Sequence, residues 1–170
     1  FFKKNSITNG LSFRLPGSGV DLERFKSKAT PSNCNSFLLV ARLIWSKGIG
    51  EYVDAARQIK SNFPNIEFNV LGFLDSSHPD GISKEIIQAW HSEGVISYLG
   101  DTDDVKPYLQ NADCVVLPSY YREGVPRTLL EAASMATPII TTNHQGCRDA
   151  IIPNKSGIKL NSNSGTLTIA

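Results

Sequence analysis

The sequence predicts an α/β domain, with a Rossmann-like, doubly wound parallel sheet of about six strands. Three observations support this fold class. From residue 37 onward, short apolar runs rich in β-formers alternate with longer segments of helical period. No internal repeat or low-complexity stretch interrupts the pattern. The 170 residues suit one domain, and 41% of them are apolar, which is enough to bury a core.

Each expected element follows from its own segment. The apolar runs FLLVA, EFNVL, ISYL, CVVL, PIIT and IKL predict strands at 37–41, 67–71, 96–99, 114–117, 138–141 and 158–160. The helical segments between them predict helices at 49–61, 83–92, 103–110 and 127–135, with a short helix at 147–151.

These elements divide the chain into three regions. Residues 1–36 form an irregular lead-in with a Gly-Ser-Gly loop, in which Gly17 and Gly19 would let the backbone approach a ligand. Residues 37–160 form the α/β domain, and residues 161–170 are expected to be a polar tail. Because the chain starts with Phe1 and ends without a closing helix, we expect both ends to be cut from a longer protein.

Composition excludes several classes of partner. Lys and Arg total 17 against 16 Asp and Glu, so no strong field attracts nucleic acid. No apolar run reaches the roughly 20 residues that span a bilayer, so we expect no transmembrane segment. The three cysteines are odd in number and form no CxxC pair, which indicates a reducing compartment and no metal cluster. We therefore expect a cytoplasmic protein, whose full-length form lies peripherally at the inner face of the membrane.

Two cations follow the first strand. Right-handed crossovers put the first and fourth strands side by side, and ligands bind beyond their carboxyl ends. There, Arg42 and Lys47 lie between a buried strand and a helix start, whose unpaired N–H groups add a third positive feature. A diphosphate would satisfy all three, although solvated loop charges explain this segment alone equally well. The loop lacks GxGxxG and P-loop patterns, which argues against those two classes of site.

A second polar segment follows the fourth strand. Gly124 suits a helix cap region and Pro126 the first helical position, so we expect bare amides there. Glu123 precedes this helix and Glu131 lies about two turns into it. Such carboxylates accept hydrogen bonds from sugar hydroxyls. Alone, Glu123 is also explained as a solvated loop acid, and Glu131 as the ion-pair partner of Arg127. Together, the two segments predict a site for an anionic sugar ligand.

These residues carry a family resemblance. From Gly17 to about Leu160, the chain resembles the C-terminal domain of retaining GT-B glycosyltransferases of family 4, the bacterial surface-polysaccharide group. The matching motifs are Arg42-x4-Lys47-Gly48, the Glu-x7-Glu pair at Glu123 and Glu131, and Gly146-Cys147-Arg148-Asp149. Two positions depart from the family pattern: Ala136 stands where glycine is frequent, and Asp149 where glutamate is usual.

The resemblance implies a role for each matched residue. Arg42 and Lys47 would hold the donor diphosphate and Glu123 would contact the transferred sugar, so these three form the expected catalytic set. Glu131 would hold the ribose hydroxyls. The remaining expected donor-binding residues act through their backbone, and they are Gly17, Gly19, Gly124, Val125, Pro126, Thr128 and Leu129.

The resemblance also implies the reaction partners. The donor would be a nucleotide-diphosphate sugar, UDP-linked, and the acceptor a saccharide or a lipid-linked saccharide. An N-terminal GT-B domain would supply the acceptor side, so this chain alone would be inactive. No metal or other cofactor is expected, because cations and helix dipoles would neutralise the leaving diphosphate. Two alternatives stay open: a UDP-sugar epimerase of the same fold, and a non-catalytic, receiver-like binding module, which would need an acidic pocket where Arg42 stands.

Overall fold

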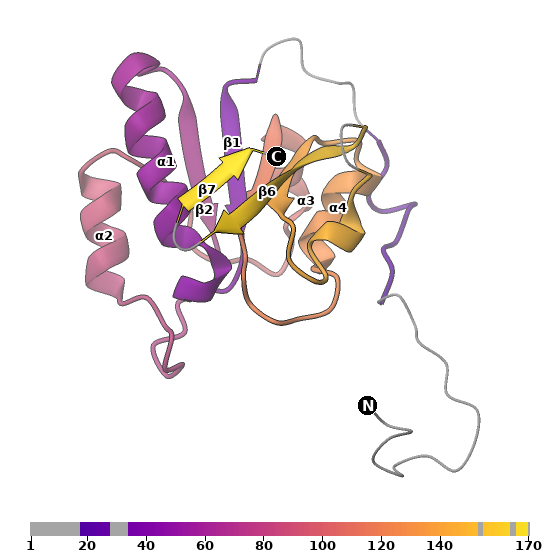
Figure 1. Cartoon of the computed structure of the whole chain (residues 1–170), viewed down its shortest axis with the longest axis horizontal. Coiled ribbons are helices and arrows are strands. Elements are labelled where there is room, and N and C mark those ends of the chain that lie inside the picture. Colours follow the sequence, from indigo (N-terminus) through magenta and orange to yellow (C-terminus); the bar gives the residue numbers. More distant parts are fainter. Residues whose placement is uncertain (1–17, 28–33, 153–154, 164–165, 170) are drawn as a thin grey trace.

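The computed structural model describes residues 18–27, 34–152, 155–163 and 166–169 (Figure 1). Gly17 lies outside these residues. The first elements are β1 (Ser36–Val40), the 3-10 helix η1 (Trp45–Lys47), α1 (Ile49–Asn62), β2 (Glu67–Leu71), α2 (Lys84–Ser92), β3 (Ser97–Tyr98) and α3 (Lys106–Asn111). The remaining elements are β4 (Cys114–Leu117), α4 (Arg127–Ser134), β5 (Ile139–Thr142), the 3-10 helix η2 (Arg148–Ala150), β6 (Gly157–Asn163) and β7 (Thr166–Ile169).

The strands form one sheet in the order β3-β2-β1-β4-β5-β6-β7. The first six strands in the chain pair in parallel, which confirms the predicted Rossmann-like sheet. β1 and β4 are neighbours, with Phe37 opposite Cys114. Helices α1 and α2 cover one face of the sheet, and α3 and α4 cover the other (Figure 1). The switch point therefore lies between β1 and β4, as expected for a doubly wound sheet.

Alternate residues of the central strands supply two core layers. Leu38 and Val115 pack under α3 and α4, whereas Leu39 and Val116 pack under α1 and α2. All four residues of β4 are buried. Because burial of one such side chain contributes about 1.5–3 kcal/mol, this two-layer packing fixes the strand ends that carry the site.

Helix α3 is shorter than predicted, because the residues before it form a separate turn. The amide of Asp104 donates to Oγ1 of Thr102 at 3.1 Å, and the amide of Lys106 donates to Oδ1 of Asp104 at 3.1 Å. These side-chain acceptors compete with helical hydrogen bonds. The helix therefore begins at Lys106, with Pro107 in its first turn, where a missing N–H costs little.

The end of the chain contains a strand where we expected a tail. β6 extends to Asn163, and β7 pairs with it in antiparallel orientation, with Leu160 opposite Ile169. Residues 161–170 therefore include an antiparallel edge to the otherwise parallel sheet, an addition common in doubly wound folds.

Helix α4 ends in a Schellman motif that contains Ala136. The amide of Thr137 donates to the carbonyl of Ala132 at 2.9 Å, and the amide of Ala136 to that of Ala133 at 3.1 Å. Ala136 has φ 56°, a left-handed conformation that costs a non-glycine residue about 1–2 kcal/mol. The structure thus explains why glycine is expected at this position.

Candidate functional site

The candidate site lies at the carboxyl edge of the sheet, where two loops meet: the 41–48 loop after β1 and the 118–124 loop after β4. The carbonyl of Ser46 accepts hydrogen bonds from the amides of Tyr120 and Tyr121, at 2.9 and 3.0 Å. Thr142 Oγ1, from β5, donates to the carbonyl of Ser119. The 118–124 loop is therefore held by the 41–48 loop on one side and by β5 on the other.

Two glycines allow this close packing. Gly48 has φ 78°, and a β-carbon there would lie 2.3 Å from the carbonyl oxygen of Pro118. Gly146, in the loop after β5, has φ 85°, and its β-carbon would lie 2.3 Å from the carbonyl oxygen of Gly124. Only glycine combines this conformation with such contact, so one glycine supports each end of the 118–124 loop.

Lys47 and Glu123 form an ion pair between the two loops. Lys47 Nζ contacts Glu123 Oε1, and the exposed fractions of the two side chains are 9% and 24%. A buried lysine is rare unless it is paired, so Glu123 supplies the charge that stabilises Lys47 here. Lys47 is predicted to contact the donor phosphates and Glu123 the donor sugar. In the structure these two residues contact each other.

Arg42 lies beside the same pair and is less enclosed. Its side chain is 41% exposed, and Nη1 lies 3.5 Å from Oδ2 of Asp75. A hydrogen bond from Ser77, and then the nearby Arg42 charge, lower the pKa of Asp75. The Arg42 guanidinium carbon lies 5.9 Å from the ring centroid of Tyr121, and Lys47 Nζ lies 5.2 Å from the same centroid. The structure thus brings the two predicted cations to one ring.

The start of α4, which follows the 118–124 loop in the chain, provides backbone donors. Pro126 is the N-cap, one position earlier than expected, and Arg127 is the first helical residue. The Leu129 amide donates to the Pro126 carbonyl at 3.1 Å, and the Leu129 side chain is fully buried in the core. Thr128 and Leu129 are both predicted to bind the donor through their backbone. The amide of the half-buried Thr128 is therefore better placed for this than that of Leu129.

Glu131 is a buried carboxylate of α4. Its residue exposure is 7%, and Oε1 lies 3.6 Å from Nη2 of Arg127, whose side chain is 74% exposed. Burial raises the pKa of Glu131, and the positive charge of Arg127 opposes this only partly. Since an ion pair with so exposed a partner contributes little, it does not account for the burial of Glu131.

The other predicted backbone contacts are accessible to different degrees. Gly124 is exposed and has open space where a β-carbon would be, whereas Val125 is half-buried and Pro126 buried. Gly19 has φ 72°, is exposed, and has open space where a β-carbon would be. In the described residues, no hydrogen bond or ion pair joins Gly19 to the cations.

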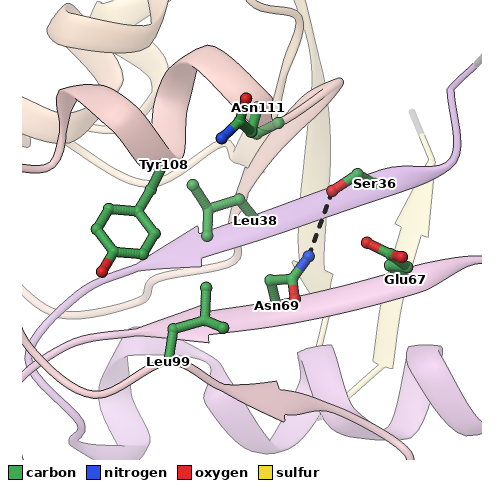
Figure 2. Close-up of a pocket in the computed structure, with 8 residues that line it drawn as sticks. Ser36, Leu38, Glu67, Asn69, Leu99, Tyr108 and Asn111 are labelled. Carbon is green, nitrogen blue, oxygen red and sulfur yellow. Dashed lines mark hydrogen bonds between the residues drawn. The ribbon is translucent and has the colours of Figure 1, made fainter.

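A separate cavity of ≈ 240 Å³ lies on the α3 side of β1 and β2 (Figure 2). Its lining includes Ser36, Glu67 and Asn69 from the strands, together with Tyr108 and Asn111 of α3. Asn69 Nδ2 donates to Ser36 Oγ at 3.3 Å. None of the described residues that line it is Lys or Arg, so this cavity does not suit a diphosphate.

Sequence reasoning missed three contributors to the site. Tyr121 contacts both cations, Asp75 pairs with Arg42, and Gly146 supports the 118–124 loop. Gly146 carried a signal, because it belongs to a matching family motif. Tyr121 follows Tyr120 in the sequence, and no pattern distinguishes which of the two rings faces the cations.

Comparisons with known proteins place most of this chain in one family. Residues 21–166 match the family described as Glycosyl transferases group 1. The chain is 35% identical, over 114 residues, to the N,N'-diacetylbacillosaminyl-diphospho-undecaprenol alpha-1,3-N-acetylgalactosaminyltransferase of Campylobacter jejuni; these are 67% of this chain and 28% of that relative. It is 29% identical, over 148 residues, to the amylovoran biosynthesis glycosyltransferase AmsK of Erwinia amylovora. This match covers 82% of this chain and 36% of that relative. The chain belongs to the group 1 glycosyl transferases.

Solved structures share the fold. A glycosyltransferase from Rickettsia africae superposes with a TM-score of 0.70 at 23% identity, covering 86% of this chain and 42% of that one. Anabaena HepE in complex with UDP-glucose superposes with a TM-score of 0.68 at 19% identity, covering 83% of this chain and 41% of HepE. The chain thus spans about a third of the length of its curated relatives. Among the described residues, no helix is long and apolar enough to cross a bilayer.

Proposed function

We propose that this chain is the donor-binding half of a retaining GT-B glycosyltransferase of family 4. Its ligand is a nucleotide-diphosphate sugar with uridine as the nucleoside. In the whole protein, the sugar passes to a saccharide or lipid-linked acceptor during surface polysaccharide synthesis. An N-terminal domain of the same fold binds that acceptor, and the whole protein works in the cytoplasm, at the inner face of the membrane.

The observation that carries this proposal is the convergence of Arg42 and Lys47. Both cations lie within 6 Å of the Tyr121 ring centroid, beyond the switch point between β1 and β4. A diphosphate carries the opposite charge and has oxygens for both. The same cations would stabilise the leaving diphosphate as the glycosidic bond breaks, so the donor needs no metal in this proposal.

The two carboxylates suit the rest of the donor. Glu123, whose side chain is 24% exposed, would accept hydrogen bonds from hydroxyls of the transferred sugar. Glu131 is more deeply buried, and it would accept them from the ribose. Because Glu131 is desolvated by burial, a hydroxyl donor would be favoured there.

The comparisons support the transferase over the two alternatives. Relatives of this chain carry transferase names, including one that acts on an undecaprenol-linked saccharide and one of amylovoran biosynthesis. UDP-glucose is bound by a protein of the same fold. Neither of these two relatives is named as an epimerase or as a receiver-like module.

Isothermal titration of the chain with UDP and GDP tests the donor site. We expect UDP to bind more tightly than GDP, and Lys47→Ala to weaken UDP about tenfold or more, since charge-assisted contacts contribute roughly 1.5–3 kcal/mol. Lys84→Ala removes the same charge from the exposed start of α2 and serves as the matched control. Unchanged UDP affinity in Lys47→Ala would remove this lysine from the site, and preference for GDP would overturn the assignment of uridine.

A transfer assay tests the need for a second domain. We expect the 170-residue chain to bind the donor but to transfer no labelled sugar to lipid-linked acceptors, whereas the full-length protein does so. Orientation of the acceptor accounts for about 7–11 kcal/mol of such a barrier, and this chain offers one wall of the cleft. Transfer by the chain at the full-length rate would contradict the proposal.

A further inference from the structure

The Tyr121 ring lies where two positive charges must be kept together. Lys47 Nζ and the Arg42 guanidinium carbon are 5.2 and 5.9 Å from its centroid. A cation within about 6 Å of an aromatic face is attracted by the ring quadrupole. One ring thus contacts both cations, although they come from opposite ends of the 41–48 loop and repel each other.

The backbone of Tyr121 is held in place independently of its side chain. Its amide donates to the Ser46 carbonyl at 3.0 Å and lies 3.2 Å from Ser119 Oγ. The Ser46 contact joins Tyr121 directly to the loop that carries the cations. Hydrogen bonds that do not depend on the ring therefore hold the backbone of Tyr121 at the site before a ligand arrives.

Within the part of the chain that the structure describes, each of the two cations also has a carboxylate partner. These carboxylates are negatively charged, as a bound diphosphate would be. Lys47 is paired with Glu123, and Arg42 lies 3.5 Å from Asp75. A diphosphate carries the same charge as these carboxylates, so it competes with them for both cations. Tyr121 is neutral, so its contact can persist when the diphosphate binds.

We propose that Tyr121 is a positioning residue of the donor site, whose ring holds Arg42 and Lys47 in place while the diphosphate replaces their carboxylate partners. This inference rests on the proposed function, because it requires a diphosphate ligand. The ring itself touches no phosphate oxygen in this proposal, and it acts through the two cations.

If the Tyr121 ring positions the two cations, its removal should weaken the binding of UDP but not that of uridine. Tyr121→Leu keeps an apolar side chain but removes the aromatic face, and Tyr121→Phe keeps the face and removes only the hydroxyl. In NMR titrations of the 15N-labelled chain, we expect Tyr121→Leu to weaken UDP about three- to tenfold, the effect of one or two cation–π contacts. Tyr121→Phe should bind UDP like the wild type. Uridine, which lacks the diphosphate, should bind all three proteins equally.

Each outcome separates this role from simple damage to the loop. Wild-type UDP affinity in Tyr121→Leu would overturn the role, as would an equal loss for uridine, which would show a disrupted fold. A loss in Tyr121→Phe as large as in Tyr121→Leu would assign the effect to the hydroxyl and overturn the role of the ring. If the wild type binds uridine as tightly as UDP, the proposed diphosphate site fails, and the positioning role fails with it.

Discussion

Replacement of Glu123 by glutamine removes one negative charge beside Lys47 and changes the side-chain volume little. In the structure, this carboxylate is the ion-pair partner of Lys47, whose side chain is only 9% exposed. A diphosphate that binds Lys47 must displace or share this partner. We therefore expect Glu123→Gln to bind UDP more tightly than the wild type, although Glu123 belongs to the expected catalytic set.

The size of the effect follows from the charge attraction that the substitution removes. The substitution removes the opposite charge but leaves Lys47 a hydrogen-bond acceptor, the glutamine amide oxygen. Opposite charges about 4 Å apart attract by about 1 kcal/mol in water and by more at a partly enclosed site, so Lys47 should become easier to recruit by about 0.5–2 kcal/mol. UDP affinity should rise roughly three- to thirtyfold. The affinity for a UDP sugar should rise less, because Glu123 also contacts the sugar in the proposed site.

Isothermal titration with UDP measures this change. Glu93→Gln is the matched control, because it removes the same charge from an exposed ion pair with Arg57, whose Nε lies 2.8 Å from the carboxylate. That variant should bind UDP like the wild type. Equal or weaker UDP binding by Glu123→Gln would refute the competition and show that Glu123 instead holds Lys47 in its binding position.

Three further substitutions test the structure around the site. Gly146→Ala places a β-carbon against the Gly124 carbonyl at a left-handed φ, so urea denaturation should show a loss of about 2 kcal/mol and UDP should bind more weakly. Ala136→Gly relieves left-handed strain and should raise the free energy of unfolding by about 0.5–1 kcal/mol; a fall would contradict the strain. Because burial raises the pKa of Glu131, the folded chain keeps this proton to higher pH than the unfolded chain does. Wild-type stability should therefore fall relative to Glu131→Gln as the pH rises above the ordinary carboxyl value of 4.5, and parallel stability profiles would contradict this.

The sheet could be predicted from sequence because its central strands are apolar throughout. The run from Cys114 to Leu117 is buried at every position, and such runs flanked by helical periods have few other arrangements. The start of helix α3 and the edge strand β7 were harder to predict. The start of α3 depends on side-chain acceptors at Thr102 and Asp104. The alternating run that forms β7, from Thr166 to Ile169, is only four residues long, so its signal is weak.

The candidate site also has a part that could be predicted from the sequence and a part that could not. Arg42, Lys47 and Glu123 could be predicted, because each follows the end of a central strand, and topology brings those ends together. Their mutual contacts could not be predicted. The Lys47–Glu123 pair and the Tyr121 ring contacts depend on the path of the 118–124 loop, which is set by hydrogen bonds to Ser46 and by close contact with Gly146.

The two glycines that support the 118–124 loop have a consequence for how the protein unfolds. Gly48, after β1, packs closely against one end of the loop, and Gly146, after β5, packs closely against the other end. The loop therefore cannot move away from either strand without disrupting this backbone packing. A nucleotide held at this loop therefore stabilises the sheet against cooperative unfolding. By mass action, a ligand at about 100 times its dissociation constant adds about 2.7 kcal/mol. Amide hydrogen exchange in β1 and β5 should slow together when UDP is added, although neither strand is expected to touch it.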